Sequence, residues 1–180
     1  VLYTHWQSPD FGLYPLEATV EAMMKLKDQG KIRAIGLSNF EKKHVEALME
    51  TAEIAPMVNQ IEFHPGYTQM DNVEYSKAFG MAVEAWSPLG SGAVLKDEFL
   101  GKIAAKYGKS TAQLCIRFAL QNDVIPMPKS VTPERIKQNM EVFDFEITDE
   151  DMKATASMPQ LGFSGFRPEE APADALVNGD

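Results

Sequence analysis

The sequence predicts an α/β fold built on parallel strands, and two features of the chain lead to this expectation. Short apolar runs rich in β-favouring residues alternate with longer amphipathic runs along most of the 180 residues. Polar or aromatic side chains stand at the ends of the apolar runs. Because serial strand–helix units normally form parallel strands joined by right-handed crossovers, we expect a parallel sheet covered by helices.

The strands and helices can be assigned in order from their periodicity. We predict strands over residues 1–5, 32–39, 57–65, 81–90 and 124–130. We predict helices over residues 16–31, 41–53, 72–80, 97–108, 110–122, 132–140 and 148–158. The first helix places Val20, Met23 and Leu26 on one face and stops at Gly30. Thr132 and Pro133 are typical first residues of a helix, and a glycine-rich loop over residues 87–92 follows the fourth strand.

The positions of the polar residues favour a closed barrel over an open doubly wound sheet. An open sheet that binds a dinucleotide carries a G-x-G-x-x-G turn after its first strand, and the sequence has no such turn. In an eight-stranded β/α barrel, functional groups gather at the carboxyl ends of the strands. The strand ends here carry His5, Ser38 and Asn39, His64, Trp86 and Ser87, and Lys129 and Ser130. We therefore predict a (β/α)8 TIM barrel, formed as a single domain over residues 1–180.

The first residues raise the question of whether the barrel is whole. The chain opens with "VLYTH", which reads as a buried strand with no methionine before it. A closed barrel needs eight strands and about 250 residues. Five parallel strands alone would expose two sheet edges. We expect the chain to supply about strands 4–8 with their helices, and the N-terminal strands to lie upstream of Val1.

Composition narrows the class of protein. A formal net charge of -9 disfavours a nucleic-acid binder, which needs a basic face. No stretch approaches the roughly 18 apolar residues of a membrane span. The single cysteine, Cys115, excludes an internal disulfide and lies in an apolar run, where we expect an inert core position. No pair of His, Cys or carboxylate residues has metal-ligand spacing, so no metal is predicted. We expect a cytoplasmic protein, monomeric or weakly oligomeric, with no nucleic-acid or membrane partner.

Two cations near the start of the helix predicted over residues 132–140 are the strongest physical sign of a binding site. Arg135 falls in the first turn, where the helix dipole disfavours a cation by roughly 0.3–1 kcal/mol. Lys129 lies just before the same turn. A phosphate between the two cations and the free N–H groups of the helix would offset this cost. The alternative is a solvated basic turn.

Several stretches make the chain resemble the aldo-keto reductases, in particular the bacterial, fungal and protozoan members of the 2,5-diketo-D-gluconate reductase type. The stretches are "HWQSP", "AIGLSNF", "VNQIEFHP", "AWSPLG" and "IPMPKSVTPERIKQN", in the order and spacing of that family, and "EVFDFEITDEDM" resembles its last helix. The resemblance covers residues 1 to about 157. It implies a barrel that binds NADPH without a Rossmann domain and transfers hydride from the nicotinamide to a carbonyl carbon.

The resemblance assigns a catalytic role to one residue of this chain. His5 matches the family's catalytic histidine, whose N–H orients the substrate carbonyl, and Trp6 would line the substrate pocket. Gln7 stands where the family commonly has proline, so the resemblance does not determine the shape of that pocket. The family's proton-donating tyrosine and its partner lysine and aspartate belong to the first half of the barrel and have no match here. We expect an upstream segment to carry them.

The resemblance also implies a path for the cofactor along the strand ends. Ser38, Asn39 and Gln60 would bind the nicotinamide carboxamide, although Ser38 or Asn39 could cap the following helix instead. Trp86 would stack on the nicotinamide ring. The loop after it would cover the pyrophosphate with backbone N–H groups, unless it is an ordinary mobile loop; its residues are Ser87, Pro88, Leu89, Gly90 and Ser91. The 2′-phosphate of NADPH would lie between Lys129 and Arg135, in an adenosine pocket completed by Ser130, Val131, Thr132, Gln138 and Asn139.

Three further predictions concern residues outside these motifs. His44 falls on a charged helix face, where we expect it to be solvated. His64 precedes a proline at a strand end and is expected to be structural. Phe163 and Phe166 in the tail would either close over the substrate, as C-terminal loops do in the resembled family, or pack loosely on the surface.

Together these expectations describe an NADP-dependent oxidoreductase that reduces a small aldehyde or ketone, of sugar or keto-acid type, to an alcohol. The alternative is a non-catalytic module of the same fold that binds NADPH or a partner protein. The motifs determine neither the physiological substrate nor the direction of the reaction.

Overall fold

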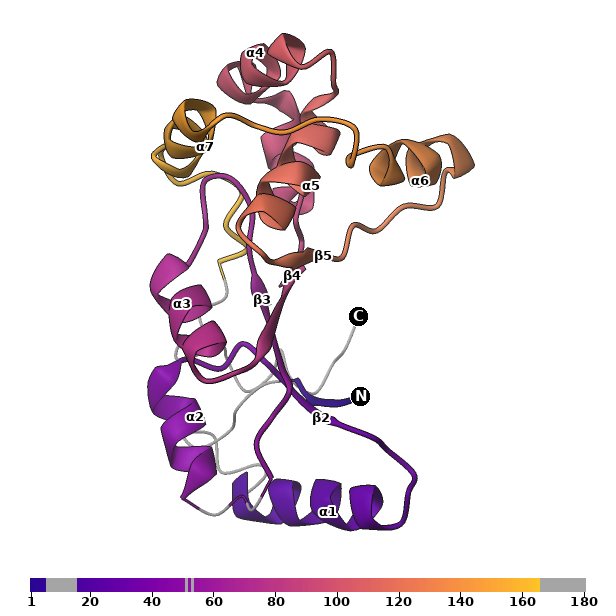
Figure 1. Ribbon diagram of the computed structural model, residues 1–180, viewed down its shortest axis with the longest axis vertical. Coiled ribbons are helices and arrows are strands. Elements are labelled where there is room, and N and C mark those ends of the chain that lie inside the picture. Colours follow the sequence, from indigo (N-terminus) through magenta and orange to yellow (C-terminus); the bar gives the residue numbers. More distant parts are fainter. Residues whose placement is uncertain (6–15, 51, 53, 166–180) are drawn as a thin grey trace. The chain divides into compact units, whose positions relative to one another are not determined.

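The computed structural model describes residues 1–5, 16–50, 52 and 54–165 (Figure 1). Its internal contacts divide the chain into two compact units. The first unit comprises Val1–Ile61, Asp71–Ala82 and Gly165–Asp180, and the second comprises Glu62–Met70 and Val83–Ser164. The single domain predicted over residues 1–180 stays a prediction.

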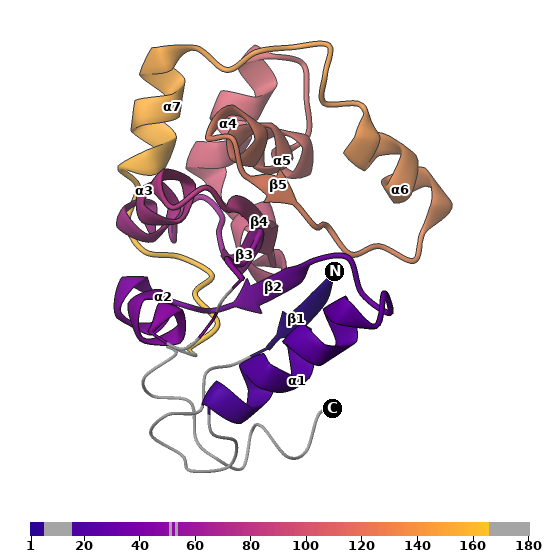
Figure 2. The same ribbon diagram turned by 60° about the horizontal axis from the view of Figure 1, so that its bottom comes forward.

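The first unit is built on three parallel strands. These are β1 (Leu2–Thr4), β2 (Ile35–Ser38) and β3 (Val58–Glu62), and β2 pairs with both of the others. The crossovers that parallel pairing requires are α1 (Leu16–Asp28) and α2 (Lys42–Met49), and α3 (Met70–Ala78) follows β3. Figure 2 shows α1 running alongside β1 and β2. The register places Ser38 opposite Gln60, so the polar ends of β2 and β3 lie side by side.

The core of the first unit is formed by the apolar faces of its helices against the sheet. It contains Val20, Leu37, Phe40, Val45, Leu48, Ala52 and Met81. A buried amide crosses this unit: Nδ2 of Asn59 donates to the carbonyl of Phe40 at 2.8 Å and to the hydroxyl of Ser76 at 3.1 Å. These bonds connect β3 both to the segment after β2 and to α3, which fixes the ends of the two strands relative to each other.

The second unit contains one strand pair and most of the helices. β4 (Ala82–Trp86) pairs in parallel with β5 (Ile125–Pro126). Between them come a 3-10 helix, η1 (Gly90–Lys96), and the helices α4 (Glu98–Lys106) and α5 (Thr111–Gln121). After β5 come α6 (Pro133–Met140) and α7 (Asp149–Ala156). A capping box at Ser110 and Gln113 begins α5.

The core of the second unit is centred on α4 and α5. Leu100, Leu114 and Phe118 are fully buried, and the ring of Phe118 stacks on that of Phe63 at 5.8 Å. Cys115 is also fully buried, which confirms the predicted core position. Burial raises the pKa of its thiol to about 12, because the charged thiolate cannot be solvated there. The thiol is therefore uncharged at neutral pH.

The predicted strands and helices are all present, and the main differences concern the region after β4 and the last strand. The segment expected as an open loop leads directly into η1. The strand expected over residues 124–130 is reduced to Ile125–Pro126. Pro126 and Pro128 have no N–H to donate, so the ladder cannot continue through them. None of the helices in the described part of the chain is long and apolar enough to span a membrane.

Candidate cofactor-binding site

A pocket in the second unit gathers residues from three parts of the chain. It has a volume of about 740 Å³ and lies between the loop after β4, the start of α5 and the segment from β5 to α6. The lining residues are Ser87, Pro88, Leu89, Ser91, Gly92, Leu95, Ser110, Ala112, Met127, Pro128, Lys129, Ser130, Val131, Thr132, Arg135, Gln138 and Asn139. The lining is rich in hydroxyl and amide groups and contains two cations.

Most of the cofactor-binding residues predicted in this unit line the pocket. The exceptions are Trp86, which is half-buried at the end of β4, and Gly90, which is buried in the loop. Sequence reasoning missed the two lining residues at the start of α5, Ser110 and Ala112. No local signal marks them, because the packing of α5 brings them to the pocket. Leu95, Met127 and Pro128 were also missed, although they lie within four positions of predicted residues in the sequence, and Gly92 closes the loop that was expected to cover the pyrophosphate.

The N-terminus of α6 forms one wall of the pocket. Thr132 is the N-cap and Pro133 the first helical residue, as predicted, but the hydroxyl of Thr132 makes no capping bond. The backbone N–H of Thr132 donates to Oγ of Ser130 at 3.3 Å. The first N–H groups of a helix have no intrahelical acceptor. The pocket therefore borders the positive end of a helix that no side chain caps.

Two cationic side chains stand beside this helix end. Lys129 and Arg135 both line the pocket and are exposed. Within the described part of the chain, neither side chain has a hydrogen-bond or ion-pair partner. By contrast, Lys106 and Lys109 lie 2.6 Å and 2.7 Å from the carboxylates of Asp151 and Asp144. The charge at this wall is thus uncompensated and suits an anion with more than one negative charge.

The loop after β4 is folded more tightly than the sequence suggests. The N–H of Ser91 donates to Oγ of Ser87 at 2.9 Å, and the two hydroxyls lie 3.2 Å apart. The N–H groups of Gly90 and Gly92 donate to the carbonyls of Ser87 and Leu89, both at 2.8 Å. These three N–H groups already have acceptors inside the loop. A ligand here would contact the serine hydroxyls, or would have to displace these internal bonds.

A second group of predicted residues lies in the first unit, at the ends of β1, β2 and β3. The hydroxyl of Ser38 donates to the carbonyl of Gln60 at 3.0 Å. Nδ2 of Asn39 lies 3.3 Å from that hydroxyl and 3.4 Å from the carbonyl of His5. Neither Ser38 nor Asn39 caps α2, because the N-cap is Glu41, so the capping alternative is wrong. The structure brings these four residues together, with His5 exposed and Ser38 and Asn39 buried.

The prediction of a solvated His44 is wrong. The residue is only 7% exposed, and its Nδ1 accepts a hydrogen bond from the backbone N–H of Glu41 at 3.0 Å. At the third position of α2 the side chain turns back toward the N-cap, which places the ring edge-on to that of Phe40. The capping hydrogen bond therefore keeps His44 buried, although its neighbours in the sequence are charged.

His64 and Phe163 have defined surroundings in the second unit. His64 is fully buried, with Nε2 at 3.3 Å from a carboxylate oxygen of Glu62 and Nδ1 at 2.9 Å from the carbonyl of Pro65. This environment agrees with the predicted structural role. The ring of Phe163 lies 4.5 Å from that of Tyr67. Trp6, Gln7 and Phe166 lie outside the described residues. Among the described residues, no three His, Cys, Asp or Glu side chains are grouped to hold a metal ion, and the predicted lack of a metal stays a prediction.

The chain is similar to known proteins in both sequence and structure. The model of the aldo/keto reductase family matches residues 1–159. The glyoxal reductase of Bacillus subtilis is 45% identical over 166 residues, which is 92% of this chain and 59% of that protein. A crystal structure of a Gox0644 mutant in complex with NADPH has a TM-score of 0.87 and 41% identity, covering 94% of this chain and 62% of that one. A protein described as a 2,5-diketo-D-gluconic acid reductase B has a TM-score of 0.82 and 31% identity, covering 88% and 56%.

The chain therefore spans less than two thirds of the length of each of these proteins. Its parallel strands, taken with these similarities, confirm the predicted fold class, part of a (β/α)8 barrel.

Proposed function

The chain belongs to the aldo/keto reductase family, and from that premise we propose that it binds NADPH and reduces a small aldehyde or ketone to an alcohol. The observation that carries the proposal is the pair of cations, Lys129 and Arg135, on a pocket at the N-terminus of α6. The NADPH complex of the Gox0644 mutant supports the same cofactor.

The pocket chemistry favours a phosphorylated dinucleotide. NADPH differs from NADH by a 2′-phosphate, and a phosphate monoester carries about 1.5 to 2 negative charges at neutral pH. Arg135 can bind such a group through two parallel N–H bonds, and Lys129 can act as a point charge. The N–H groups at the start of α6 add further donors. The ribose hydroxyl of NADH would leave both cations without a counter-ion, so we expect a clear preference for NADPH.

The polar residues at the ends of β2 and β3 suit a carboxamide such as that of the nicotinamide. A carboxamide offers two N–H donors and one carbonyl acceptor. The hydroxyl of Ser38 and the amides of Asn39 and Gln60 can match those groups, and we propose that they hold the nicotinamide. The ring of Trp86 would support the nicotinamide by stacking. When bound, NADPH supplies the hydride for the reduction.

His5 is proposed to act on the substrate. A neutral imidazole can donate its N–H to the carbonyl oxygen, which orients the substrate and stabilises negative charge on that oxygen. Trp6 would line the same site. The names of the glyoxal reductase and of the 2,5-diketo-D-gluconic acid reductase B support a small aldehyde, or a carbonyl of sugar or keto-acid type, as substrate.

We further propose that the protein acts in the cytoplasm as a monomer or weak oligomer, with residues 1–180 belonging to one barrel domain. A single, fully buried cysteine suits a reducing compartment.

The second candidate is a non-catalytic module that binds NADPH or a partner protein. The pocket suits it as well, because Lys129 and Arg135 would bind the phosphate of the cofactor whether or not turnover follows. In that case the pocket would retain its affinity for the phosphorylated cofactor without supporting turnover.

Two measurements test the proposal. Calorimetric titration with 2′,5′-ADP and 5′-AMP isolates the contribution of the 2′-phosphate, and we expect the doubly phosphorylated nucleotide to bind at least about tenfold more tightly. Equal affinities would contradict the NADPH assignment. Oxidation of NADPH is then followed with glyoxal, keto acids and diketo sugar acids, in a protein that includes the expected upstream segment with its tyrosine, lysine and aspartate. Binding by that protein without oxidation of NADPH by any of these would favour the second candidate.

A further inference from the structure

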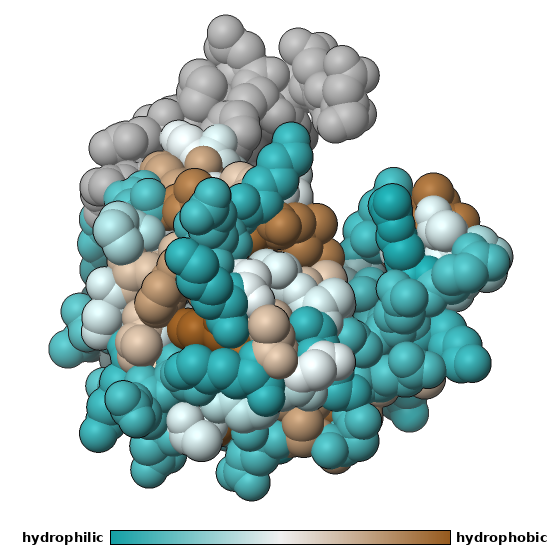
Figure 3. Space-filling model, turned by 90° about the horizontal axis from the view of Figure 1, so that it is seen from above, coloured by the Kyte–Doolittle hydropathy of each residue, from teal (hydrophilic) through white to brown (hydrophobic). Residues whose placement is uncertain are grey.

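Helix α6 contributes three residues to the pocket but has no buried side chain of its own. Arg135, Gln138 and Asn139 line the pocket, whereas no residue of α6 is buried. Its two large apolar residues, Ile136 and Met140, are 47% and 69% exposed. Figure 3 views this end of the molecule from above and shows mostly hydrophilic side chains, with a hydrophobic patch among them on the right-hand lobe. A helix of this length is not stable in isolation, so contacts with the rest of the unit must hold it in place, and full apolar burial is not among them.

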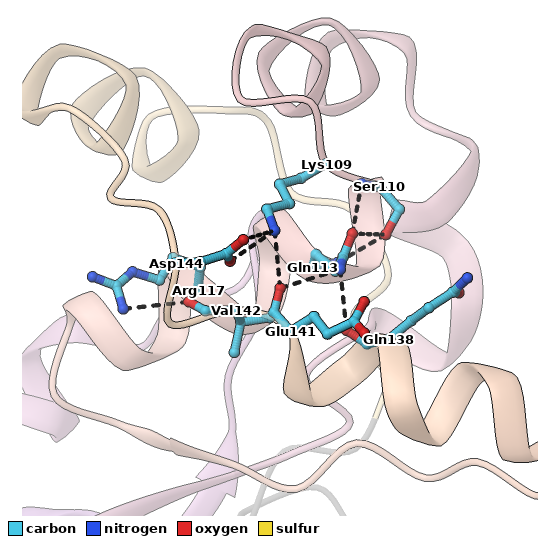
Figure 4. A network of polar contacts seen from close by, with 8 residues as sticks. All are labelled: Lys109, Ser110, Gln113, Arg117, Gln138, Glu141, Val142 and Asp144. Carbon is cyan, nitrogen blue, oxygen red and sulfur yellow. Dashed lines mark hydrogen bonds and ion pairs between the residues drawn. The ribbon is translucent and has the colours of Figure 1, made fainter.

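The amide of Gln113 supplies such contacts (Figure 4). Its Nε2 donates to the carbonyls of Gln138 and Glu141, at 3.1 Å and 3.2 Å. Its Oε1 accepts from the backbone N–H and the hydroxyl of Ser110, both at 3.0 Å. Both donors and both lone pairs of the amide are therefore used. The opposite orientation of the amide would place its oxygen against two carbonyls, so the network determines the orientation.

These bonds reach the C-terminal end of α6. The last carbonyls of a helix lack the usual i+4 donor, and a side-chain amide can donate to them, although the carbonyl of Gln138 also accepts from the N–H of Glu141 at 3.1 Å. Nζ of Lys109 adds a bond to the carbonyl of Glu141 at 3.3 Å while it pairs with the carboxylate of Asp144 at 2.7 Å. Polar bonds thus attach the C-terminus of α6 to the beginning of α5.

Gln113 belongs to a row of polar residues four positions apart on α5. Arg117 donates to the carbonyl of Val142 at 3.4 Å. Gln121 donates to the carbonyl of Ile147 at 2.8 Å and accepts from its N–H at 2.7 Å. Such spacing places all three side chains on one face of the helix. Of the three, Gln113 donates to a carbonyl of α6, whereas Gln121 bonds to Ile147 beyond that helix, which makes Gln121 a matched control.

We propose that Gln113 is a positioning residue for the cofactor pocket: it binds Ser110 on one wall and the backbone of α6 on another, and so sets where Arg135 stands. The inference rests on the proposed function, because the ligand assigned to the pocket is the 2′-phosphate of NADPH. Gln113 itself does not line the pocket. It acts through the backbone of Gln138 and Glu141.

The test compares Gln113→Glu with Gln121→Glu. Each variant keeps an oxygen that can accept the same bonds and loses the N–H groups that donate to carbonyls. Gln113→Glu also retains the Ser-x-x-Glu capping box of α5, so the start of that helix is preserved. Because a carboxylate at position 113 could pair with Lys109, Gln113→Leu serves as a second variant without a new charge. Thermal unfolding shows whether each variant is folded.

Two readouts are needed. The first is amide hydrogen exchange of residues 134–140 without ligand, which we expect to become about tenfold faster in both Gln113 variants and to stay unchanged in Gln121→Glu. The second is the ratio of the affinities for 2′,5′-ADP and 5′-AMP, which should fall about tenfold in the Gln113 variants only. A general loss of stability would not change that ratio selectively.

Unchanged exchange in α6, equal effects of the Gln113 and Gln121 variants, or faster exchange with an unchanged affinity ratio would each overturn the inference. If the wild-type protein does not distinguish 2′,5′-ADP from 5′-AMP, the proposed function fails instead. The exchange data then still decide whether Gln113 holds α6.

Discussion

The ammonium group of Lys106 on α4 lies 2.6 Å from a carboxylate oxygen of Asp151 on α7. The hydroxyl of Tyr107 donates to the other carboxylate oxygen, also at 2.6 Å. Hydrogen bonds from Lys106 and then from Tyr107 lower the pKa of Asp151 below its ordinary value, because they stabilise the charged form. This contact joins α7 to α4 across 45 positions of the sequence.

The Asp151 contact predicts a loss of stability in acid. A carboxyl whose pKa is lower in the folded chain contributes fully above the ordinary aspartate value of about 3.9. The contribution is lost as the pH falls through the lower folded-state pKa. Urea unfolding at a series of acidic pH values should show a shallower fall in the free energy of unfolding for Asp151→Asn than for wild type. Asp149→Asn, an exposed position in the same turn, should keep the wild-type slope; equal slopes in all three proteins would contradict the prediction.

The cations of the pocket predict a selective loss of NADPH affinity. Replacing Lys129 or Arg135 by alanine removes a charge-assisted contact to the 2′-phosphate, which is expected to weaken NADPH binding by roughly tenfold or more. Binding of NADH, measured by the same titration, should change little. Lys137→Ala is the control, because Lys137 is exposed on the same helix and does not line the pocket. A loss of equal size in Lys137→Ala would mean that general positive charge, not the pocket, attracts the cofactor.

Replacing His5 is expected to lower turnover without changing the affinity for NADPH. His5→Leu removes the N–H proposed to contact the substrate carbonyl, so kcat/KM for carbonyl reduction should fall by about 10²–10³. The affinity for NADPH should stay near the wild-type value, since the cofactor is assigned to other residues. Steady-state kinetics and NADPH titration on the same preparation give both numbers. A wild-type kcat/KM in His5→Leu would remove His5 from the proposed mechanism.

Cys115 predicts an unreactive thiol. Because burial raises its pKa to about 12, almost no thiolate is present at neutral pH, and the sulfur is inaccessible to reagents. A disulfide reagent should label no thiol in the native protein and one thiol per chain after denaturation. Rapid labelling of the native protein would show that α5 opens readily.

The packing around Gly36 in the first unit leaves no room for a side chain. A Cβ atom at this position of β2 would lie 2.7 Å from two ring carbons of Tyr3 on β1. Gly36→Ala should therefore lower the free energy of unfolding by about 1–3 kcal/mol through overpacking. Gly101→Ala is the matched control: its Cβ would meet only the hydroxyl of Thr111, at 3.9 Å, and alanine in a helix should add about 0.5–1 kcal/mol. Similar unfolding midpoints for the two variants would contradict the packing argument.

The order of strands and helices was predictable because the signals for them are local. Apolar periodicity and helix-start residues such as Thr132 and Pro133 depend only on neighbours in the sequence, and α6 begins where they indicate. The fifth strand was expected to be disrupted by Pro126 and Pro128, and the structure shortens it to Ile125–Pro126. All of the residues predicted for the adenosine end of the cofactor line one pocket, because they come from a single continuous segment.

Other features depended on contacts that no local pattern contains. His44 has charged neighbours in the sequence, but capping geometry turns its ring into the protein. The loop after β4 has the composition of a flexible segment, yet Ser87 and Ser91 bond to each other and order it. Ser110 lines the pocket although nothing near it in the sequence indicates a ligand.

The sequence by itself determined the fold class, the family and the types of residue available for binding, since periodicity and motif spacing are properties of neighbouring residues. Only the tertiary structure decided which of those residues share a pocket and what holds them there. The bond from Gln113 to the carbonyl of Gln138 joins positions 25 residues apart. Such a bond forms only when the two helices are packed against each other. Its contribution to stability therefore exists only in the folded unit and is absent from either segment alone.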